Sequence, residues 1–338
     1  MTAPISRGRF AAGTAAAFAS IAIVRAPARA ADFTYKFANN VSVDHPLNVR
    51  MRECWDAVTK ETKGRFVVQI FPNNELGGDT QMLQQLRTGA VQFFTLDGGI
   101  LQSVVQVAGI QGVGFAFKDS AEAFRALDGA LGDYVRDEIR KQNLYVHPKM
   151  WENGMRQITS SSKPIRTAAD LDGFKIRTPA GALWVDLFKS LGAAPSPLNF
   201  SELYTALQTH VFEGQENPYA IIDVGRLYEV QKYLSVTNHM WSAYHFLGNA
   251  DAWKALPPDI QAVAERNLAK YALLQRRDTQ LRNDSLSDKL ARRGLAFNHA
   301  DTSGFRTRLS SSGFYARWKD KFGPQAWALL EKTSGKLA

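Results

Sequence analysis

Apolar and polar residues alternate with the period of a β-strand in several short stretches near the start of the chain. The first three predicted strands are residues 33–38, 65–71 and 91–96. Amphipathic stretches between them predict helices at 44–64 and 79–89. Asp44 and Asp79 are the expected N-caps of these helices. Strands that alternate with helices of this length predict a largely parallel sheet with helices on both faces.

The same alternation returns after a helical stretch at 120–143. The further predicted strands are 144–146, 174–178 and 211–217. The further predicted helices are 180–191, 201–209, a long one at 260–293 that Asp259 caps, and a final one at 318–337. Residues 86–91 resemble residues 207–212, and each segment leads from a short helix into a strand, which favours two related halves.

The first thirty residues have the three parts of a secretory signal peptide. They hold four arginines and no acidic residue, an uncharged stretch at 10–24, and small residues at Ala28 and Ala30. We expect cleavage after Ala30 and a mature protein in the periplasm. The alternative is a buried, alanine-rich N-terminal helix. The general secretory and twin-arginine routes both stay open, because Gly8 stands where the second adjacent arginine of a twin-arginine signal should be.

The net charge of the chain has to be divided between the predicted signal peptide and the mature protein before it says anything about partners. The 338 residues carry 41 Lys and Arg against 32 Asp and Glu, a net charge of +9. Removing residues 1–30 leaves 37 bases against the 32 acids, or +5. No dense basic block remains, so a nucleic-acid partner is not expected. No later segment is long and apolar enough to span a bilayer, so the mature chain is not expected to be membrane-embedded.

No catalytic, cofactor or metal motif stands out. The chain lacks G-x-S-x-G, H-E-x-x-H and a P-loop, and its six histidines are scattered. The lone Cys54 lies in an apolar helical stripe and is expected to be a buried hydrophobe. We therefore expect no cofactor, no metal and no enzyme. If the protein were an enzyme, Asp97 with Glu216 would be its best acid/base pair.

Two arginines and one asparagine are the informative polar residues. Arg177 and Asn217 each stand at the C-terminal end of a predicted strand, where ligands of open α/β sheets bind. A guanidinium can hold a carboxylate with two hydrogen bonds, and an asparagine amide can donate and accept. Arg156 is a second candidate. Taken singly, each arginine could equally be a surface or salt-bridged residue.

An ordered set of motifs joins these residues. They are GFKIRTP at 173–179, FSELYTALQ at 200–208, GQENP at 214–218, YEVQKY at 228–233 and TNH at 237–239. In this set the chain resembles the extracytoplasmic solute-binding subunit, of the dicarboxylate-binding-protein (DctP) type, of TRAP (tripartite ATP-independent periplasmic) transporters. The resemblance covers nearly the whole mature chain.

The resemblance implies a two-lobed α/β periplasmic binding protein fold, with a ligand cleft between the lobes and a long C-terminal helical region. Lobe I would comprise 31–154 and about 243–282, and lobe II would comprise 155–242 and about 283–338. The protein would capture a small organic acid and deliver it to a TRAP membrane permease. A sensory binding protein and a secreted enzyme acting on an organic acid are the alternatives.

The resemblance also assigns roles to the polar residues. Arg177 corresponds to the arginine that clamps the ligand carboxylate, Asn217 to the asparagine that hydrogen-bonds it, and Arg156 to a second cleft arginine. The other expected cleft residues are Asn39, Glu75, Asp97, Trp151, Phe200, Tyr219 and Trp241. Dicarboxylates, 2-oxo acids, hydroxy acids and aromatic acids would all use the same arginine, and the aromatic candidates favour a monocarboxylate with an apolar or aromatic tail.

Overall fold

The computed structural model of the protein describes residues 31–337 and Met1. Residues 2–30, on which the predicted signal peptide and its cleavage site rest, lie outside the described part. Within that part, no helix combines the length and the apolar character needed to cross a bilayer.

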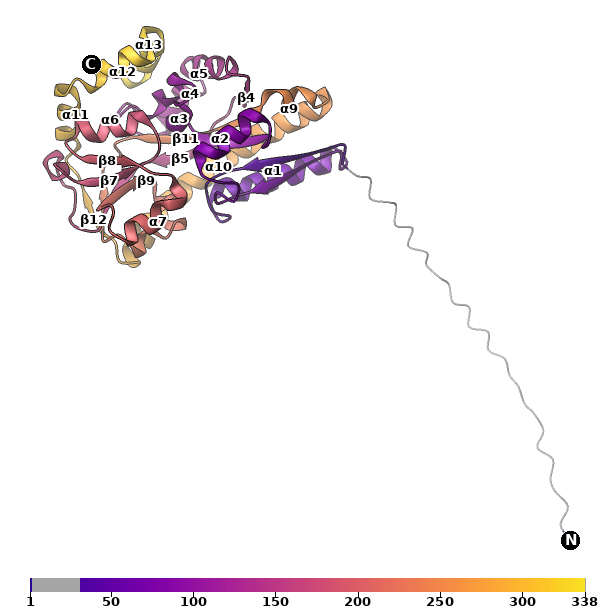
Figure 1. Ribbon diagram of the computed structural model, residues 1–338, viewed down its shortest axis with the longest axis horizontal. Coiled ribbons are helices and arrows are strands. Elements are labelled where there is room, and N and C mark those ends of the chain that lie inside the picture. The colour runs from indigo at the N-terminus through magenta and orange to yellow at the C-terminus, as the bar shows by residue number, and fades with distance from the viewer. Residues whose placement is uncertain (2–30, 338) are drawn as a thin grey trace. The chain divides into compact units, whose positions relative to one another are not determined.

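Two six-stranded sheets form the framework (Figure 1). The first sheet has the order β2-β1-β3-β11-β4, with β5 also paired to β11. Its strands are β1 (Phe33–Ala38), β2 (Phe66–Phe71), β3 (Phe93–Asp97), β4 (Leu144–Val146), β5 (Trp151–Met155) and β11 (Trp241–Asn249). The second sheet has the order β12-β10-β6-β9-β7-β8. Its strands are β6 (Gln157–Ser160), β7 (Lys175–Thr178), β8 (Ala194–Pro197), β9 (Gly214–Asn217), β10 (Tyr233–Val236) and β12 (Ala296–His299).

Helices pack around both sheets. In chain order, the first helices are α1 (Pro46–Glu61), α2 (Asp79–Thr88), α3 (Gly98–Leu101), the 3₁₀-helix η1 (Gln106–Gly112), α4 (Ser120–Leu127) and α5 (Ala130–Arg140). The middle ones are η2 (Ala168–Leu171), α6 (Ala182–Ser190), α7 (Phe200–Gln208), α8 (Tyr219–Val224) and η3 (Leu227–Glu229). The last are α9 (Ala250–Ala255), α10 (Pro258–Arg292), α11 (Thr302–Ser311), α12 (Phe314–Phe322) and α13 (Pro324–Ser334).

The expectation of a largely parallel sheet is wrong. Five of the strand pairings among the described residues are parallel and five are antiparallel. The antiparallel pairings all involve β6 or β11, neither of which the sequence pattern predicts. Every residue of β6 and of β11 is buried. A strand buried on both faces carries no polar–apolar alternation that a pattern could detect.

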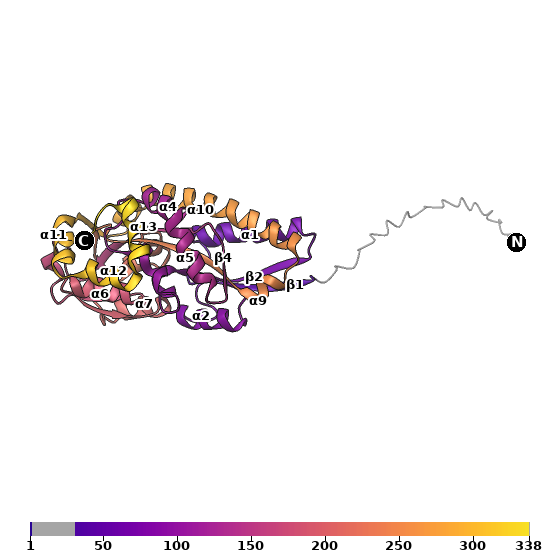
Figure 2. The same ribbon diagram turned by 90° about the horizontal axis from the view of Figure 1, so that it is seen from above.

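Arg156 is the single residue between β5 in the first sheet and β6 in the second. The chain returns between β10 and β11, and there the backbone N–H of Arg156 donates to the carbonyl of Met240, 2.8 Å away. The long helix α10 packs on α1 (Figure 2). It also packs on β5 and on α8, so it contacts elements of both halves, the parts built around the first and the second sheet. The boundaries of the two lobes stay a prediction.

Several predicted helix ends need correction. Residues 120–143 form two helices, α4 and α5, because Asp128 and Gly129 interrupt the first. The single final helix expected at 318–337 is wrong, since Gly323 separates α12 from α13. The cap of α1 is His45, whose Nδ1 accepts from the N–H of Leu47. Gly78 caps α2 and Pro257 caps α10, so Asp79 and Asp259 each lie inside the helix that they were expected to cap.

The two halves touch closely where α3 meets α6. A methyl group added at Gly99 would lie 2.0 Å from Cζ3 of Trp184, and one added at Gly181 would lie 2.5 Å from the carbonyl oxygen of Gly99. The backbone N–H of Leu183 donates to Oε1 of Gln102 across the same contact, at 3.2 Å. Glycine at 99 is therefore required by this close approach and not by an unusual backbone angle.

We expect Gly99→Ala to lower the free energy of unfolding by about 1 to 3 kcal/mol, since overpacking forces Trp184 or the α3 backbone to move. The matched control is Gly304→Ala in α11, where an added methyl group has no neighbour within 4 Å. That change should raise the free energy of unfolding by up to about 1 kcal/mol through helix propensity. Urea unfolding measures both. Equal stability of the two variants would show that α3 and α6 do not stay in contact in solution.

Candidate functional site

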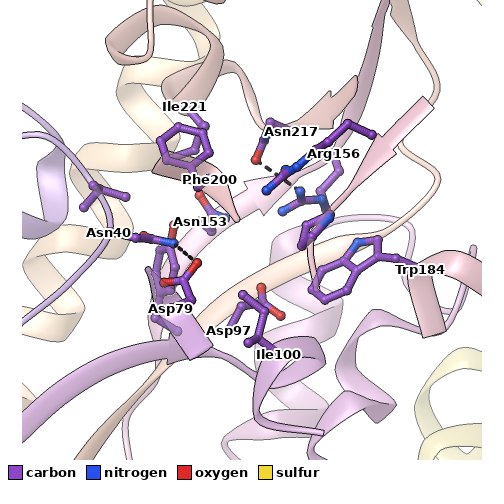
Figure 3. Close-up of a pocket in the computed structure, with 14 residues that line it drawn as sticks. Asn40, Asp79, Asp97, Ile100, Asn153, Arg156, Trp184, Phe200, Asn217 and Ile221 are labelled. Atoms are coloured by element: carbon purple, nitrogen blue, oxygen red, sulfur yellow. Dashed lines mark hydrogen bonds between the residues drawn. The ribbon is translucent and has the colours of Figure 1, made fainter. Parts of the chain in front are cut away.

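A cavity with a volume of about 30 Å³ lies between the two halves (Figure 3). Residues of both sheets line it: Asn40, Val41, Asp79, Asp97, Ile100, Asn153, Arg156, Arg177, Pro179, Trp184, Phe200, Asn217, Ile221 and Tyr244. Charged, amide and apolar side chains are mixed in this wall. A concave site with a few converging polar groups on an apolar background is typical of small-molecule binding.

Arg177 is a buried cation without a carboxylate hydrogen-bonded to it among the described residues. It lies in β7, between β8 and β9, and its side chain is 2% exposed. Its Nε and Nη2 both donate to the carbonyl oxygen of Leu198, at 2.9 and 2.5 Å. Burial lowers the pKa of Arg177 to about 10, so the group still carries its charge at neutral pH. The site thus presents a desolvated positive charge.

Arg156, in contrast, is already neutralised. Its Nε and Nη2 bind the two carboxylate oxygens of Glu216 at 2.5 and 2.7 Å, and both residues are buried. Burial opposes the charge of Arg156, but the carboxylate of Glu216 outweighs it and raises the pKa. Nη1 of Arg156 also donates to Oγ of Ser242, at 3.2 Å. This two-pronged ion pair fixes the guanidinium in place.

Glu216 is held from its other side by His239, whose Nε2 lies 3.1 Å from Oε2 of the carboxylate. Burial lowers the pKa of His239 and keeps the ring neutral. A carboxylate only accepts, so Nε2 carries the proton, and Nδ1 accepts from the hydroxyl of Thr237 at 2.8 Å. Burial opposes the charge of Glu216, but Arg156 and His239 outweigh it and lower the pKa. Glu216 is therefore a fixed anion.

Asn217, the residue after Glu216, is the last residue of β9. Its Oδ1 accepts from Nη2 of Arg156 at 3.1 Å, and its Nδ2 donates to Oε1 of Gln215 at 2.6 Å. Arg177 pairs with Gln215 in the parallel ladder, so Arg177 and Asn217 are on the same face of the second sheet. This places the amide beside the unpaired guanidinium.

Two carboxylates lie on the side of the cavity that the first half supplies. Asp97 accepts from the N–H of Gly99 at 2.8 Å and from the hydroxyl of Ser242 at 2.5 Å, and burial raises its pKa. Asp79 accepts from Nδ2 of Asn40 at 3.0 Å through Oδ2. Its Oδ1 has no partner among the described residues. Burial raises the pKa of Asp79 to about 6, against the lowering effects of Asn40 and Arg177.

The cavity brings together five of the ten residues expected from the sequence, namely Asp97, Arg156, Arg177, Phe200 and Asn217. The other five lie elsewhere. Trp151 and Trp241 belong to the hydrophobic cores, and Asn39 is hydrogen-bonded to Asn48. Glu75 is exposed, and Tyr219 lines a different hollow beside α10. Whether the five residues in the wall bind a ligand stays a prediction.

Sequence reasoning missed five polar or aromatic residues of the wall: Asn40, Asp79, Asn153, Trp184 and Tyr244. A signal existed for Asn40, which follows the C-terminal end of β1, where ligands of open sheets bind. Asp79 stands where the sequence pattern predicts a helix cap, so nothing in the pattern points to the cavity. Tyr244 lies in β11, which the pattern did not predict, and Trp184 lies on a helix whose other large residues are core.

Family and sequence comparisons point to one class of protein. A family model described as bacterial extracellular solute-binding protein, family 7, matches residues 37–313. The chain is 36% identical over 261 residues to uncharacterized protein y4mM of Sinorhizobium fredii, a match that takes in 77% of this chain and about half, 48%, of that longer protein. It is 32% identical over 226 residues to the 2,3-diketo-L-gulonate-binding periplasmic protein YiaO of Escherichia coli, covering 67% of this chain and 69% of that one.

Solved structures share the fold. A TRAP periplasmic solute-binding protein from Polaromonas sp. JS666, bound to D-erythronate, matches with a TM-score of 0.85 and 28% identity, over 90% of this chain and 99% of that one. The sugar acid binding protein of Advenella mimigardefordensis, in complex with galactonate, matches with a TM-score of 0.86 and 26% identity, over 91% and 100%. The predicted two-lobed α/β fold is confirmed by these matches.

We expect Asp79→Asn to stabilise the ligand-free protein above pH 6. The pKa of Asp79 rises from 3.8 to about 6 on folding, so ionised Asp79 opposes folding. This difference corresponds to about 3 kcal/mol when the group is ionised in both states. The variant should therefore exceed the wild type by about 2 to 3 kcal/mol at pH 8, and the gain should vanish as the pH falls toward 3.8.

Urea unfolding at a series of pH values from 4 to 8 measures this gain. The control is Asp320→Asn, because Asp320 is exposed on α12. It should change the free energy of unfolding little at any pH. A wild type as stable as Asp79→Asn at pH 8 would contradict the raised pKa.

Proposed function

Because the chain belongs to family 7 of the bacterial extracellular solute-binding proteins, we propose that it captures a small organic acid outside the cytoplasm and delivers it to the membrane permease of a TRAP transporter. The relatives named above bind 2,3-diketo-L-gulonate, D-erythronate and galactonate, all of them organic acids. The signal peptide, with cleavage after Ala30, would bring the mature chain to the periplasm.

The unpaired charge of Arg177 is the observation that carries this proposal. A buried cation that no carboxylate contacts directly is unfavourable, and a carboxylate that enters the cavity reduces that penalty. The guanidinium has a second edge beyond the one that binds Leu198, so a carboxylate can bind it without breaking the existing contact. Asn217 on the same face would then orient the carboxylate.

Arg156 has a different role in this proposal. Because Glu216 occupies two of its nitrogens, Arg156 contributes little net charge to the cavity. It positions Asn217 and the junction between β5 and β6. Closure of the two lobes around the acid would exclude water and strengthen the charged hydrogen bonds at Arg177.

The alternative of an enzyme with Asp97 and Glu216 as its acid/base pair receives no support from the geometry. Both oxygens of Glu216 are occupied by Arg156 and His239, and its pKa is lowered. A general base needs an oxygen free to approach the substrate. Both oxygens of Asp97 also accept hydrogen bonds from the protein.

We expect a thermal-shift screen of organic acids, on the protein without residues 1–30, to identify binders. A ligand present at about 100 times its dissociation constant should add about 2.7 kcal/mol to the free energy of unfolding. Amines and neutral sugars of similar size are the matched controls and should not shift the unfolding temperature. Binding only by such uncharged or cationic solutes would contradict the proposal.

We expect Arg177→Lys to weaken binding of an acid found in that screen by about 2 kcal/mol or more, because the ammonium keeps the charge but loses the planar fork. Titration calorimetry measures the affinity. The matched control is Arg292→Lys, since Arg292 is exposed at the end of α10. Its affinity should equal that of the wild type. Unchanged affinity in Arg177→Lys would show that Arg177 does not hold the carboxylate.

A further inference from the structure

The buried polar groups that lack a hydrogen-bond partner differ between the two sides of the cavity. The unpaired guanidinium of Arg177 and the indole N–H of Trp184 belong to the half built on the second sheet. The indole nitrogen of Trp184 is buried and has no partner among the described residues. Asn40, Asp79 and Asn153 belong to the half built on the first sheet. Figure 3 shows Asn40 and Asp79 across the cavity from Arg156, Asn217 and Trp184.

Three buried oxygens on the first-sheet side lack a hydrogen-bond donor, and the hydroxyl of Tyr244 in β11 also lines this side. Asn40 Oδ1, Asp79 Oδ1 and Asn153 Oδ1 are buried and have no hydrogen-bond partner among the described residues. The amide nitrogen of each of the two asparagines already donates one hydrogen bond to the protein. Asn40 Nδ2 donates to the Asp79 carboxylate at 3.0 Å, and Asn153 Nδ2 donates to Ser242 Oγ at 2.9 Å.

The orientation of Asn153 follows from its neighbours. Arg156 can only donate, and it donates to Ser242 Oγ. The single proton of Ser242 goes to the carboxylate of Asp97, 2.5 Å away. Ser242 must therefore accept from Asn153, which gives Nδ2 to Ser242 and leaves Oδ1 free. A flip of the Asn153 amide would set two acceptors against each other.

We propose that Asp79, Asn40 and Asn153 form a second subsite that accepts hydrogen bonds, and that it selects organic acids with hydroxyl groups along the end remote from the carboxylate. The inference rests on the proposed function, because the carboxylate end must lie at Arg177. It replaces the expectation of an apolar or aromatic tail. Three acceptors on three separate elements suit several hydroxyl groups better than one compact donor such as an ammonium group.

The subsite also acts against other acids. An apolar tail leaves three buried oxygens without donors, and each such loss carries the desolvation penalty of an unsatisfied group. A second carboxylate has no proton to donate and brings a negative charge next to Asp79 and Asp97. Selection thus comes from rejection of tails that lack donors as much as from attraction of hydroxyl groups.

Two series of acids of matched length test this inference by titration calorimetry. The four-carbon series is erythronate, butanoate, succinate and 4-aminobutanoate. The six-carbon series is gluconate, hexanoate, adipate and 6-aminohexanoate. In the series that fits the cavity, we expect the hydroxylated acid to bind at least tenfold more tightly than each of the other three. A dicarboxylate or an amino acid that binds most tightly would overturn the proposal.

Substitutions at Asp79 and Asn40 test whether the second subsite causes the preference for hydroxylated acids. Asp79→Asn should reduce the preference for the hydroxylated acid over the dicarboxylate at least tenfold, because it removes the charge that repels the second carboxylate. Asn40→Ala, at a half-buried position, removes one acceptor and should reduce the preference over the unsubstituted acid. The control Asp320→Asn should leave both ratios unchanged. Unchanged ratios in Asp79→Asn and Asn40→Ala would overturn the proposal.

The outcomes separate this inference from the function on which it rests. If acids bind in a way that depends on Arg177 but show no preference for hydroxyl groups, the acceptor subsite is wrong and the binding function stands. If no acid of either series, and none in the wider screen, binds to the wild type, the proposed function itself fails and the subsite fails with it.

Discussion

The buried ion pair between Arg156 and Glu216 is the contact on which the arrangement of the cavity depends. Arg156 is the residue at which the chain passes from the first sheet to the second, and Glu216 lies in β9, next to β6 in the second sheet. Ser242 links the pair to Asp97 in the first sheet. A buried pair of this kind is weak evidence for stability, because desolvation offsets much of the attraction. Its consequence is geometric, since it fixes how the two halves meet.

The same ion pair makes the two arginines of the cavity different. With Glu216 committed to Arg156, no carboxylate is hydrogen-bonded to Arg177 in the described part of the chain, although Glu216 and Asp79 are near enough to affect its pKa. Arg177 therefore stays charged and desolvated. On the other side, Asp79 keeps an oxygen without a donor. Both groups are unfavourable in the ligand-free protein, and the hydrophobic core, whose largest cluster includes residues of both sheets, must supply the stability that tolerates them.

The sequence predicted the framework where local patterns were sufficient. The strands β1 and β4 have the predicted bounds, and Arg177 and Asn217 lie at the strand ends that suggested them. Prediction from the sequence failed where burial on both faces removes the alternation of polar and apolar residues, as in β6 and β11. It also failed where a residue fits two local roles, as Asp79 does. An aspartate before an amphipathic stretch looks like a cap, but Gly78 takes that position and frees Asp79 for the cavity. Trp151 and Trp241 could not be separated from wall residues, since a core tryptophan and a cavity tryptophan have the same sequence context.

Position, and not total charge, decides which solute such a protein can hold. Outside the cavity, charges at the surface are screened beyond about 8 Å at physiological salt, so a surplus of +5 in the chain without residues 1–30 has little influence on a small anion. In the cavity wall, Asp79 and Asp97 match Arg156 and Arg177 in number, and Glu216, which lies behind the wall, is bound to Arg156. The cavity is therefore not a generally positive site. An anion is favoured there because the guanidinium of Arg177 has no carboxylate hydrogen-bonded to it among the described residues, and the acids opposite restrict what the rest of that anion can be.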